Sequence, residues 1–302
     1  MSSLCKTYFE NENVSLKDYY SDNIYTWCTN CGNYGIAAAT KRALVAENIE
    51  PKDTFMCFDI GCNGNGSDKI GGYRLHGLHG RVIPVATGAA LANRNLSVIA
   101  SGGDGATLSE GIGHLVHAIR SNYNITFLMH NNCNYALTKG QASASTRQDV
   151  PMDSSPDGTP SDTLNFMNFV LSLGASFAAR TFSGNVQQMT EVIRAGIRHR
   201  GFSVIEILQN CPTYNKDTTH EWYQDRIYDT IEIKDYDNSN FDSALNISKD
   251  MSERIATGVL FANPNSVPFD QRLENRQNYS TELVDEVKSY NQISQELFSR
   301  FI

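Results

Sequence analysis

The chain has 302 residues, of which 40% are hydrophobic and 19% are charged, and no long apolar tract interrupts its mixed composition. This indicates a soluble globular protein and excludes a membrane-spanning helix and wholesale disorder. A chain of this length hides about three quarters of its unfolded surface, so folding requires neither disulfides nor a structural metal. The net charge of -8 and the lack of a basic block argue against nucleic acid as a partner.

The N-terminal residues lack the basic start and apolar stretch of a secretory signal, so we expect a cytoplasmic protein with no membrane association. The seven cysteines are an odd number, which favours reduced thiols over a disulfide framework. Cys57 lies inside an apolar strand pattern and is typical of core packing.

Residues 1–25 are polar, and we expect an N-terminal extension that orders only on a partner. Residues 26–215 alternate short apolar runs with helical patterns, which predicts an α/β fold with a largely parallel sheet flanked by helices. The predicted strands are 54–60, 95–101, 124–130, 174–180 and 202–208. Between the second and third of them, Leu108, Ile112, Leu115, Val116 and Ile119 form one apolar helical face.

Two further segments differ from this alternation. Residues 142–161 are rich in Pro, Ser, Thr and Asp, which predicts a long surface loop, and long loops in compact domains are often functional. Residues 216–302 are more charged and less periodic, so we expect a small C-terminal extension. It has an apolar patch at 255–261 and a predicted helix at 281–299.

The most informative motif runs from Gly102 to Tyr135. Asp104 follows one predicted strand and Asn132 follows the next, and a right-handed crossover brings both to the same sheet edge, where ligands bind in such folds. A carboxylate and an amide oxygen beside glycines suit a Mg²⁺ ion that holds a diphosphate. The Gly-Asp-Gly segment alone would be read as an ordinary turn. Joined to the paired Asn131 and Asn132, it favours a metal site.

Four cysteines form the second pattern. Cys28 and Cys31 lie in WCTNCG, Cys62 follows the first predicted strand, and Cys211 follows the last. The last two therefore belong to the same sheet edge as Asp104, so four thiolates can meet beside the diphosphate site. Four cysteines bind either structural Zn²⁺ or an iron-sulfur cluster, and this spacing alone leaves both open.

These motifs resemble the β subunit of the 2-oxoacid:ferredoxin oxidoreductases, which bind thiamine diphosphate and one 4Fe-4S cluster. The resemblance covers nearly all of residues 26–216, including WCTNCGNYGI, DIGCNGNG, GGDGATLSEGIGHLVHAIR and GFSVIEILQNCPTYNK. It implies a thiamine diphosphate-binding fold and a 26–215 domain that holds both cofactors.

The resemblance also implies site residues. Asp104, Asn132 and the backbone carbonyl of Asn134 would bind Mg²⁺, and Cys28, Cys31, Cys62 and Cys211 would hold the cluster. Thiamine diphosphate would contact Ile60, Gly61, Cys62, Asn63, His79, Gly105, Ala106, Ala136 and Leu137. Lys139 could meet a substrate carboxylate, or it could be a solvated loop lysine. For His79 the cofactor role is favoured over that of a satisfied loop histidine, and His114 and His117 are expected to be structural.

By the same resemblance, the protein would oxidatively decarboxylate a 2-oxoacid, pyruvate or 2-oxoglutarate or both, to acyl-CoA and CO2 with reduction of ferredoxin. An α subunit, or a fused γ-α chain, would supply the group that activates the cofactor and bind coenzyme A, so this chain alone would be inactive.

The sequence departs from the family pattern at four places. Thr29-Asn30 replaces the usual Pro-Gly, Cys133 follows the paired asparagines, Ala136 stands where Gly is common, and Ala144 stands where Pro is common. None of them removes a ligand.

Two rival functions remain open. A thiamine-dependent decarboxylase or transferase without redox chemistry would need the Asp104 motif but has no use for four cysteines. A zinc-stabilised binding protein without activity would keep the fold, and thiamine diphosphate would not raise its melting temperature.

Overall fold

The computed structural model describes residues 8–276 and 281–289, and its described strands form one eight-stranded sheet in the order β2-β1-β3-β4-β6-β5-β8-β7. The strands are β1 (Thr54–Phe58), β2 (Tyr73–His76), β3 (Ser97–Gly103), β4 (Ile125–Asn131), β5 (Phe177–Phe182), β6 (Phe202–Leu208), β7 (Ile227–Asp229) and β8 (Ile255–Ala262). The α-helices are α2 (Asn33–Ala46), α3 (Val82–Ala92), α4 (Ile112–Ser121), α5 (Phe166–Ser172), α6 (Val186–Arg198), α7 (His220–Gln224), α8 (Phe241–Ile247) and α9 (Leu283–Ser289).

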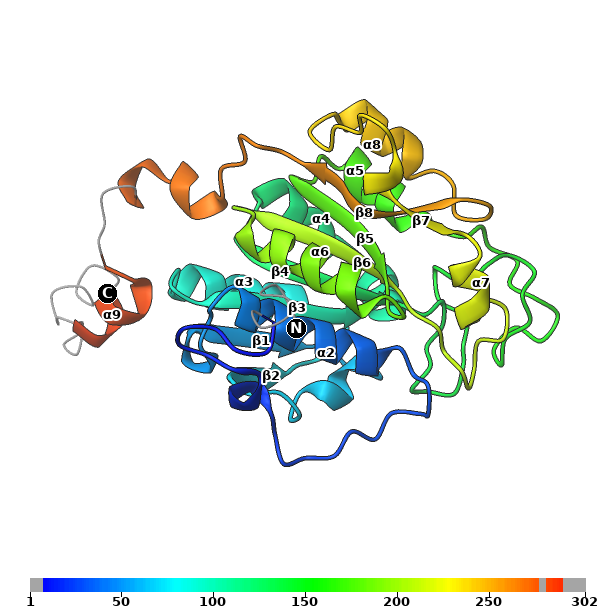
Figure 1. The fold of residues 1–302 in the computed structure, drawn as a ribbon, viewed down its shortest axis with the longest axis horizontal. Coiled ribbons are helices and arrows are strands. Elements are labelled where there is room, and N and C mark those ends of the chain that lie inside the picture. Colours follow the sequence, from blue (N-terminus) through cyan, green and yellow to red (C-terminus); the bar gives the residue numbers. More distant parts are fainter. Residues whose placement is uncertain (1–7, 277–280, 290–302) are drawn as a thin grey trace, which may run out of the picture.

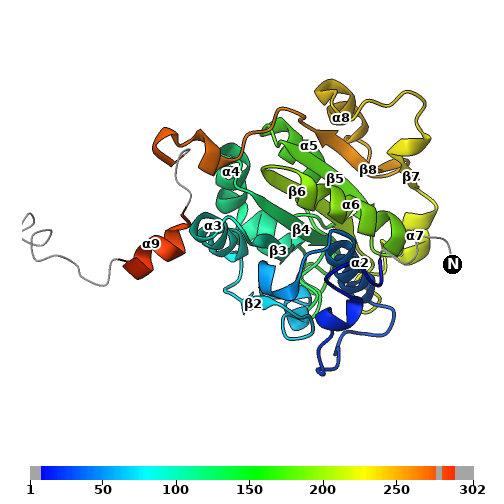
Figure 2. The same cartoon turned by 60° about the vertical axis from the view of Figure 1, so that its left-hand side comes forward.

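Helices cover both faces of the sheet, which explains why every residue of the central strands β4 and β6 is buried rather than every second one (Figures 1 and 2). On one face, α3, α4, α5 and α8 pack over a core that includes Leu115 and Phe166. On the other face, α2 and α6 pack over a core that includes Leu44 and Ile193. The helices of the described segments include none long and apolar enough to span a membrane.

The α/β fold with a largely parallel sheet is confirmed, and each of the five predicted strands overlaps an observed one, β1, β3, β4, β5 and β6. The helix predicted from the apolar face of Leu108 to Ile119 begins at Ile112 as α4, because a π-helical turn at Ala106–Glu110 precedes it. Two strands had no sequence signal. All four residues of the edge strand β2 are exposed, so it lacks an apolar face. β7 has only three residues.

The C-terminal segment contributes to the sheet. The apolar patch at 255–261 forms β8, which pairs antiparallel with β5. Of the predicted helix at 281–299, residues 283–289 are helical and 290–302 lie outside the described residues. Glu282, just before α9, bonds to Arg94, which follows α3, at 3.1 Å. The predicted 142–161 loop contains neither helix nor strand.

The N-terminal segment differs from the expectation that it orders only on a partner. Residues 8–25 pack on the domain, with Val14 and Tyr19 buried in the α2 side of the core. The Tyr19 hydroxyl donates to the Ile49 carbonyl at 2.8 Å and lies 3.0 Å from Thr54 Oγ1. The sequence did not predict these buried contacts because the segment is polar overall. Residues 1–7, including Cys5, lie outside the described residues.

Candidate functional site: a cavity and four thiols at the carboxyl ends of the strands

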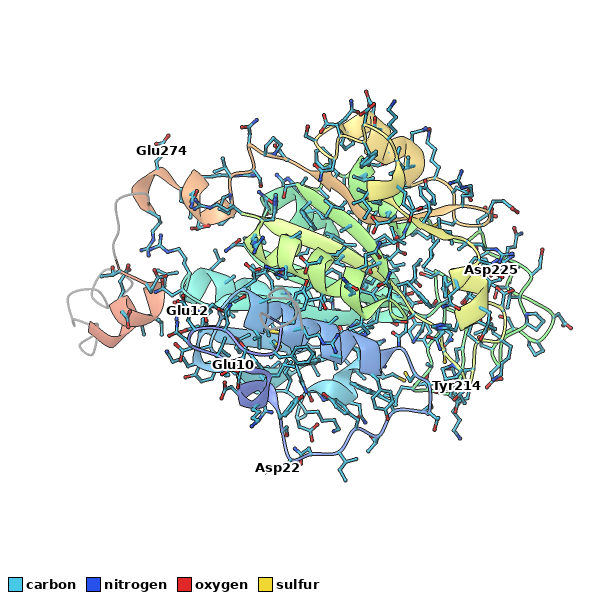
Figure 3. The ribbon with its side chains drawn as sticks, viewed as in Figure 1. Glu10, Glu12, Asp22, Tyr214, Asp225 and Glu274 are labelled. Carbon is cyan, nitrogen blue, oxygen red and sulfur yellow. The ribbon has the colours of Figure 1, made fainter. Side chains whose placement is uncertain are left out.

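The predicted site residues follow four adjacent strands. β1, β3, β4 and β6 are neighbours and run parallel, so their carboxyl ends form one edge. Cys62, Asp104, Asn132 and Cys211 follow these four strands in turn. The strand order therefore brings these four residues, which are far apart in the sequence, to one edge of the sheet. The side-chain view marks Tyr214, in the loop after Cys211, on this side of the molecule (Figure 3).

A cavity of about 150 Å³ opens at this edge. All nine residues predicted to contact thiamine diphosphate line it, as do Asp104, Asn132 and Asn134. Its lining also contains residues that the sequence did not single out, namely Asn33, Gly103, His130, Tyr135, Thr138 and Gln209. Helix α2, through Asn33, and the loops after four strands thus contribute to one cavity.

Among the described residues, Asp104 is the only acidic side chain that lines the cavity, and it is 1% exposed. Burial raises the pKa of this carboxyl to about 7, although it accepts hydrogen bonds from the Ser143 hydroxyl at 2.5 Å and from backbone N–H groups, including that of Asn132. A buried carboxylate whose charge is this poorly compensated favours a nearby cation.

The oxygen atoms beside Asp104 complete this polar corner. Asn132 Oδ1 accepts from the Asn134 backbone N–H at 3.3 Å, and Asn134 Nδ2 donates to the Asn132 carbonyl at 3.1 Å. Asn134 Oδ1 is buried and has no hydrogen-bond partner among the described residues. Carboxylate and amide oxygens with spare acceptor capacity are the ligands that Mg²⁺ prefers. The residues present therefore fit a magnesium-bound diphosphate.

His79 is held at the other side of the cavity. Its Nδ1 donates to the Ile60 carbonyl at 3.1 Å, and its Nε2 lies 3.3 Å from a Glu110 carboxylate oxygen. The buried Asp59 lies 3.4 Å from Nδ1 and also accepts from the Gly80 backbone N–H at 2.9 Å. These contacts fix the orientation of the imidazole. The sequence did not single out Asp59 and Glu110, because their role depends on their contacts with His79 in the fold.

Cys28 and Cys31 lie in a tight turn, with the Cys31 N–H donating to the Cys28 carbonyl at 3.1 Å. Asn30, inside the turn, has φ 63°, a left-handed conformation that Gly adopts freely and Asn tolerates. This explains how Asn30 can replace the usual glycine. The Asn30 carbonyl accepts from Asn210 Nδ2 at 3.0 Å, which ties the turn to the residue before Cys211.

The four thiols interact electrostatically. Burial raises the pKa of Cys62 to about 12, with further contributions from Cys31, Cys211 and Cys28. Burial likewise raises the pKa of Cys31, with contributions from Cys211 and Cys28. Within residues 8–276 and 281–289, no group of three or more His, Cys, Asp or Glu side chains is arranged to hold a metal ion.

Cys31 has several hydrogen-bond donors directed at its sulfur. Asn33 Nδ2 lies 3.5 Å from Cys31 Sγ and Gln209 Nε2 lies 3.6 Å from it. The Asn33 backbone N–H and side chain both lower the thiol pKa against the effect of burial. N–H donors of this kind stabilise a charged, metal-bound sulfur, so the donor set fits a thiolate-bound cluster.

The remaining predicted residues lie outside the cavity lining. Lys139 is exposed in the loop after Leu137, with φ 84°. His114 is half-buried on α4, with Nε2 2.5 Å from an Arg81 nitrogen, and His117 is exposed on the same helix.

Comparison with known proteins agrees with this geometry. The family model of the thiamine pyrophosphate enzyme C-terminal TPP binding domain matches residues 59–207. The family model of the C-terminal region of the pyruvate ferredoxin oxidoreductase β chain matches residues 211–278. The first match spans the strand ends around the cavity, and the second begins at Cys211.

Individual relatives extend the match over most of the chain. Subunit β of 2-oxoacid:ferredoxin oxidoreductase 2 from Aeropyrum pernix is 36% identical over 266 residues, 85% of this chain and 86% of the relative. Subunit KorB of 2-oxoglutarate oxidoreductase from Mycobacterium tuberculosis is 38% identical over 199 residues, 66% of this chain and 53% of the relative.

Among solved structures, a chain of the 2-oxoglutarate:ferredoxin oxidoreductase from Magnetococcus marinus, solved with 2-oxoglutarate, coenzyme A and succinyl-CoA bound, superposes with a TM-score of 0.85. It is 31% identical, and the match covers 93% of this chain and 97% of that chain. The chain therefore belongs to the β subunits of the 2-oxoacid:ferredoxin oxidoreductases and has the thiamine pyrophosphate-binding domain of that family.

Proposed function

We propose that this β subunit, with an α subunit, oxidatively decarboxylates a 2-oxoacid, pyruvate or 2-oxoglutarate or both, to acyl-CoA and CO2 while reducing ferredoxin. The observation that carries the proposal is the position of Cys62. Cys62 lines the cavity together with Asp104, Cys211 follows β6 at the same sheet edge, and the Asn30–Asn210 hydrogen bond ties the turn of Cys28 and Cys31 to the residue before Cys211. An electron-releasing centre and an electron-accepting centre at this edge would be neighbours.

In this proposal, Mg²⁺ is held by Asp104, Asn132 and the backbone carbonyl of Asn134, and the diphosphate of thiamine diphosphate lies against them. The cofactor supplies an electron sink for the loss of CO2. Ile60, Gly61, Asn63, Gly105, Ala106, Ala136 and Leu137 shape the cavity around it. A Cβ at Gly105 would lie 2.4 Å from the Tyr135 ring, so only glycine allows this loop to pack as it does.

His79 and Lys139 would act on the substrate side. Asp59, Ile60 and Glu110 keep the His79 imidazole at the cavity wall, where it can hold or pass a proton. Lys139 belongs to the same loop as Leu137 and Thr138, which line the cavity. Its ammonium group can reach a substrate carboxylate at the open side.

For the electron acceptor, we assign Cys28, Cys31, Cys62 and Cys211 as the ligands of a 4Fe-4S cluster, which removes electrons one at a time. The support is the common sheet edge of Cys62 and Cys211, the Asn30–Asn210 hydrogen bond that ties the Cys28–Cys31 turn to it, and the N–H donors of Asn33 and Gln209 on Cys31. Hydrogen bonds to the sulfurs and partial burial are the means by which a protein adjusts a cluster's potential.

Exposed apolar side chains in the cavity lining and next to it in the chain support an α or fused γ-α partner. Leu137 and Ile60 line the cavity and are 55% and 38% exposed, and Leu78, which precedes His79, is 75% exposed. Exposed apolar side chains at a ligand cavity are typical of a surface buried against another polypeptide. Coenzyme A and ferredoxin would then approach the assembled complex.

The test is turnover by the complex purified anaerobically with its partner subunits. We expect coenzyme A-dependent reduction of ferredoxin or viologen with 2-oxoglutarate, pyruvate or both, and none by the β subunit alone. Asp104→Asn should abolish it, whereas the control Asp53→Asn, at a half-exposed aspartate outside the cavity lining, should not. Release of CO2 from a 2-oxoacid without acceptor reduction would favour a non-redox decarboxylase or transferase, and a zinc-containing protein without turnover would favour a binding role.

A further inference from the structure

Gln209 lies between the two proposed cofactor sites. It follows β6 directly, and its backbone N–H donates to the Asn131 carbonyl at 2.8 Å, which fixes it beside the end of β4. The side chain is 1% exposed and lines the cavity that also contains Asp104. It is therefore a buried amide in the wall of the cavity, and its two ends have different surroundings.

The nitrogen end faces the cysteines. Gln209 Nε2 donates to Cys31 Sγ at 3.6 Å. The approach depends on Gly32, because a Cβ there would lie 2.6 Å from Gln209 Cγ and 2.5 Å from Ser183 Oγ. The turn that contains Cys31 thus packs directly on the Gln209 side chain and holds its amide against the sulfur.

The oxygen end is unsatisfied. Gln209 Oε1 is buried and finds no hydrogen-bond donor among the residues that the structure describes. The amide of Asn33, which also donates to Cys31, differs in this respect, because its Oδ1 accepts from His130 Nδ1 at 2.9 Å. A buried carbonyl oxygen without a donor is costly. At a cavity wall, it indicates a contact that forms when a ligand binds.

We propose that Gln209 joins the two sites: its Nε2 binds the Cys31 sulfur and its Oε1 meets an electropositive group of the bound thiamine diphosphate. This rests on the proposed function. Gln209 Oε1 is an acceptor and needs a donor or a positive group. Neither a 2-oxoacid at neutral pH nor a diphosphate bound to Mg²⁺ supplies one, because both present only acceptor atoms. The cofactor has two electropositive groups, the amine of its aminopyrimidine ring and its thiazolium cation, and either would satisfy Oε1.

Two substitutions separate the ends of the side chain. Gln209→Met keeps the shape but removes both donor and acceptor. Gln209→Glu keeps acceptor oxygens but replaces the N–H donor with a negative group beside Cys31. Gln188→Met is the control, because both ends of that amide are paired within the chain, with Thr181, Asp229 and Thr257. All are made in the anaerobically purified complex, with iron content and melting temperature as checks on folding.

We expect Gln209→Met to weaken binding of thiamine diphosphate about fivefold to tenfold, as the loss of one hydrogen bond predicts. Gln209→Glu should bind it within about twofold of wild type, yet shift the cluster's reduction potential to a more negative value. Gln188→Met should change neither. The affinities are measured by calorimetric titration of cofactor-depleted complex, and the potentials by redox titration followed by electron paramagnetic resonance.

Two cofactor analogues identify the group. One has a carbonyl in place of the amine, and the other has a neutral thiazolone ring. The analogue that lacks the contacted group should bind wild type and Gln209→Met equally well, whereas the other should keep the fivefold to tenfold difference. Equal binding of thiamine diphosphate to wild type and Gln209→Met, or the same loss for all three compounds, would overturn the inference alone. Failure of the wild-type complex to bind thiamine diphosphate would overturn the proposed function with it.

Discussion

Gly105 offers a sharp test of how the cofactor loop is packed. A Cβ at this position would lie 2.4, 2.6 and 2.8 Å from three atoms of the Tyr135 ring, closer than any van der Waals contact. The Gly105 backbone has φ -57° and ψ -54°, which alanine adopts without strain, so the cost of Gly105→Ala is steric. The Tyr135 hydroxyl donates to the Glu110 carboxylate at 3.2 Å, so the ring can move aside only by giving up that contact.

Overpacking of this kind costs about 1–3 kcal/mol. With an unfolding entropy of about 2.1 cal/mol/K per residue, the 302 residues convert this to a fall of about 2–5 °C in melting temperature. The matched control is Gly88→Ala on α3, where an added Cβ meets nothing within 4 Å and alanine is favoured in a helix by about 1 kcal/mol.

The assays are thermal unfolding without added cofactor and calorimetric titration with thiamine diphosphate, for wild type and both variants in the same complex. Gly105→Ala should lower the melting temperature and weaken thiamine diphosphate binding, while Gly88→Ala should raise the melting temperature slightly and leave binding unchanged. A Gly105→Ala protein that melts at or above wild type would show that Tyr135 does not confine this loop.

Three further outcomes follow from buried groups and from the cysteine turn. In the wild-type structure, the fully buried Arg180 lies 2.7 Å from the Glu206 carboxylate. Glu206→Gln removes this counter-charge and should lower the free energy of unfolding, measured with denaturant, by about 3–5 kcal/mol; a change below about 1 kcal/mol would refute this. Burial lowers the pKa of His199 from 6.5 to about 4, so the unfolded chain binds its proton first, and stability present above pH 6.5 is lost as the pH falls toward 4. The loss from this residue should be about 2 kcal/mol after allowance for partial exposure, and His199→Gln should flatten the acid limb of the stability profile; an unchanged limb would contradict it. Asn30→Gly should keep the cluster and melting temperature, whereas Asn30→Val, which cannot easily adopt φ 63°, should lose iron on purification; equal iron content in both would argue against the left-handed turn.

The sequence predicted the features that depend on periodicity and strand connection. Five apolar runs became five strands, and the crossover rule brought Asp104 and Asn132 to one edge because β3 and β4 are parallel neighbours. It also placed Cys62 and Cys211 there, since each follows a strand.

The features that the sequence missed depend on contacts between distant residues. Tyr19 looked like part of a polar extension, yet it is buried against Ile49 and Thr54. Gln209 and Asn33 are ordinary amides in the sequence, and only the fold directs them at Cys31. A polar residue directly after a buried strand, two positions before a candidate ligand, is the one signal that could have identified Gln209.

The most direct test of the account is the iron, acid-labile sulfide and zinc content of the anaerobically purified complex, compared between wild type and Cys211→Ser. If the four thiols hold a cluster beside the cavity, wild type should contain about four more irons and four more sulfides per β subunit than the variant, with no zinc difference. Equal iron in the two proteins, or a difference of one zinc per subunit, would contradict the claim that the four cysteines form an electron-transfer centre.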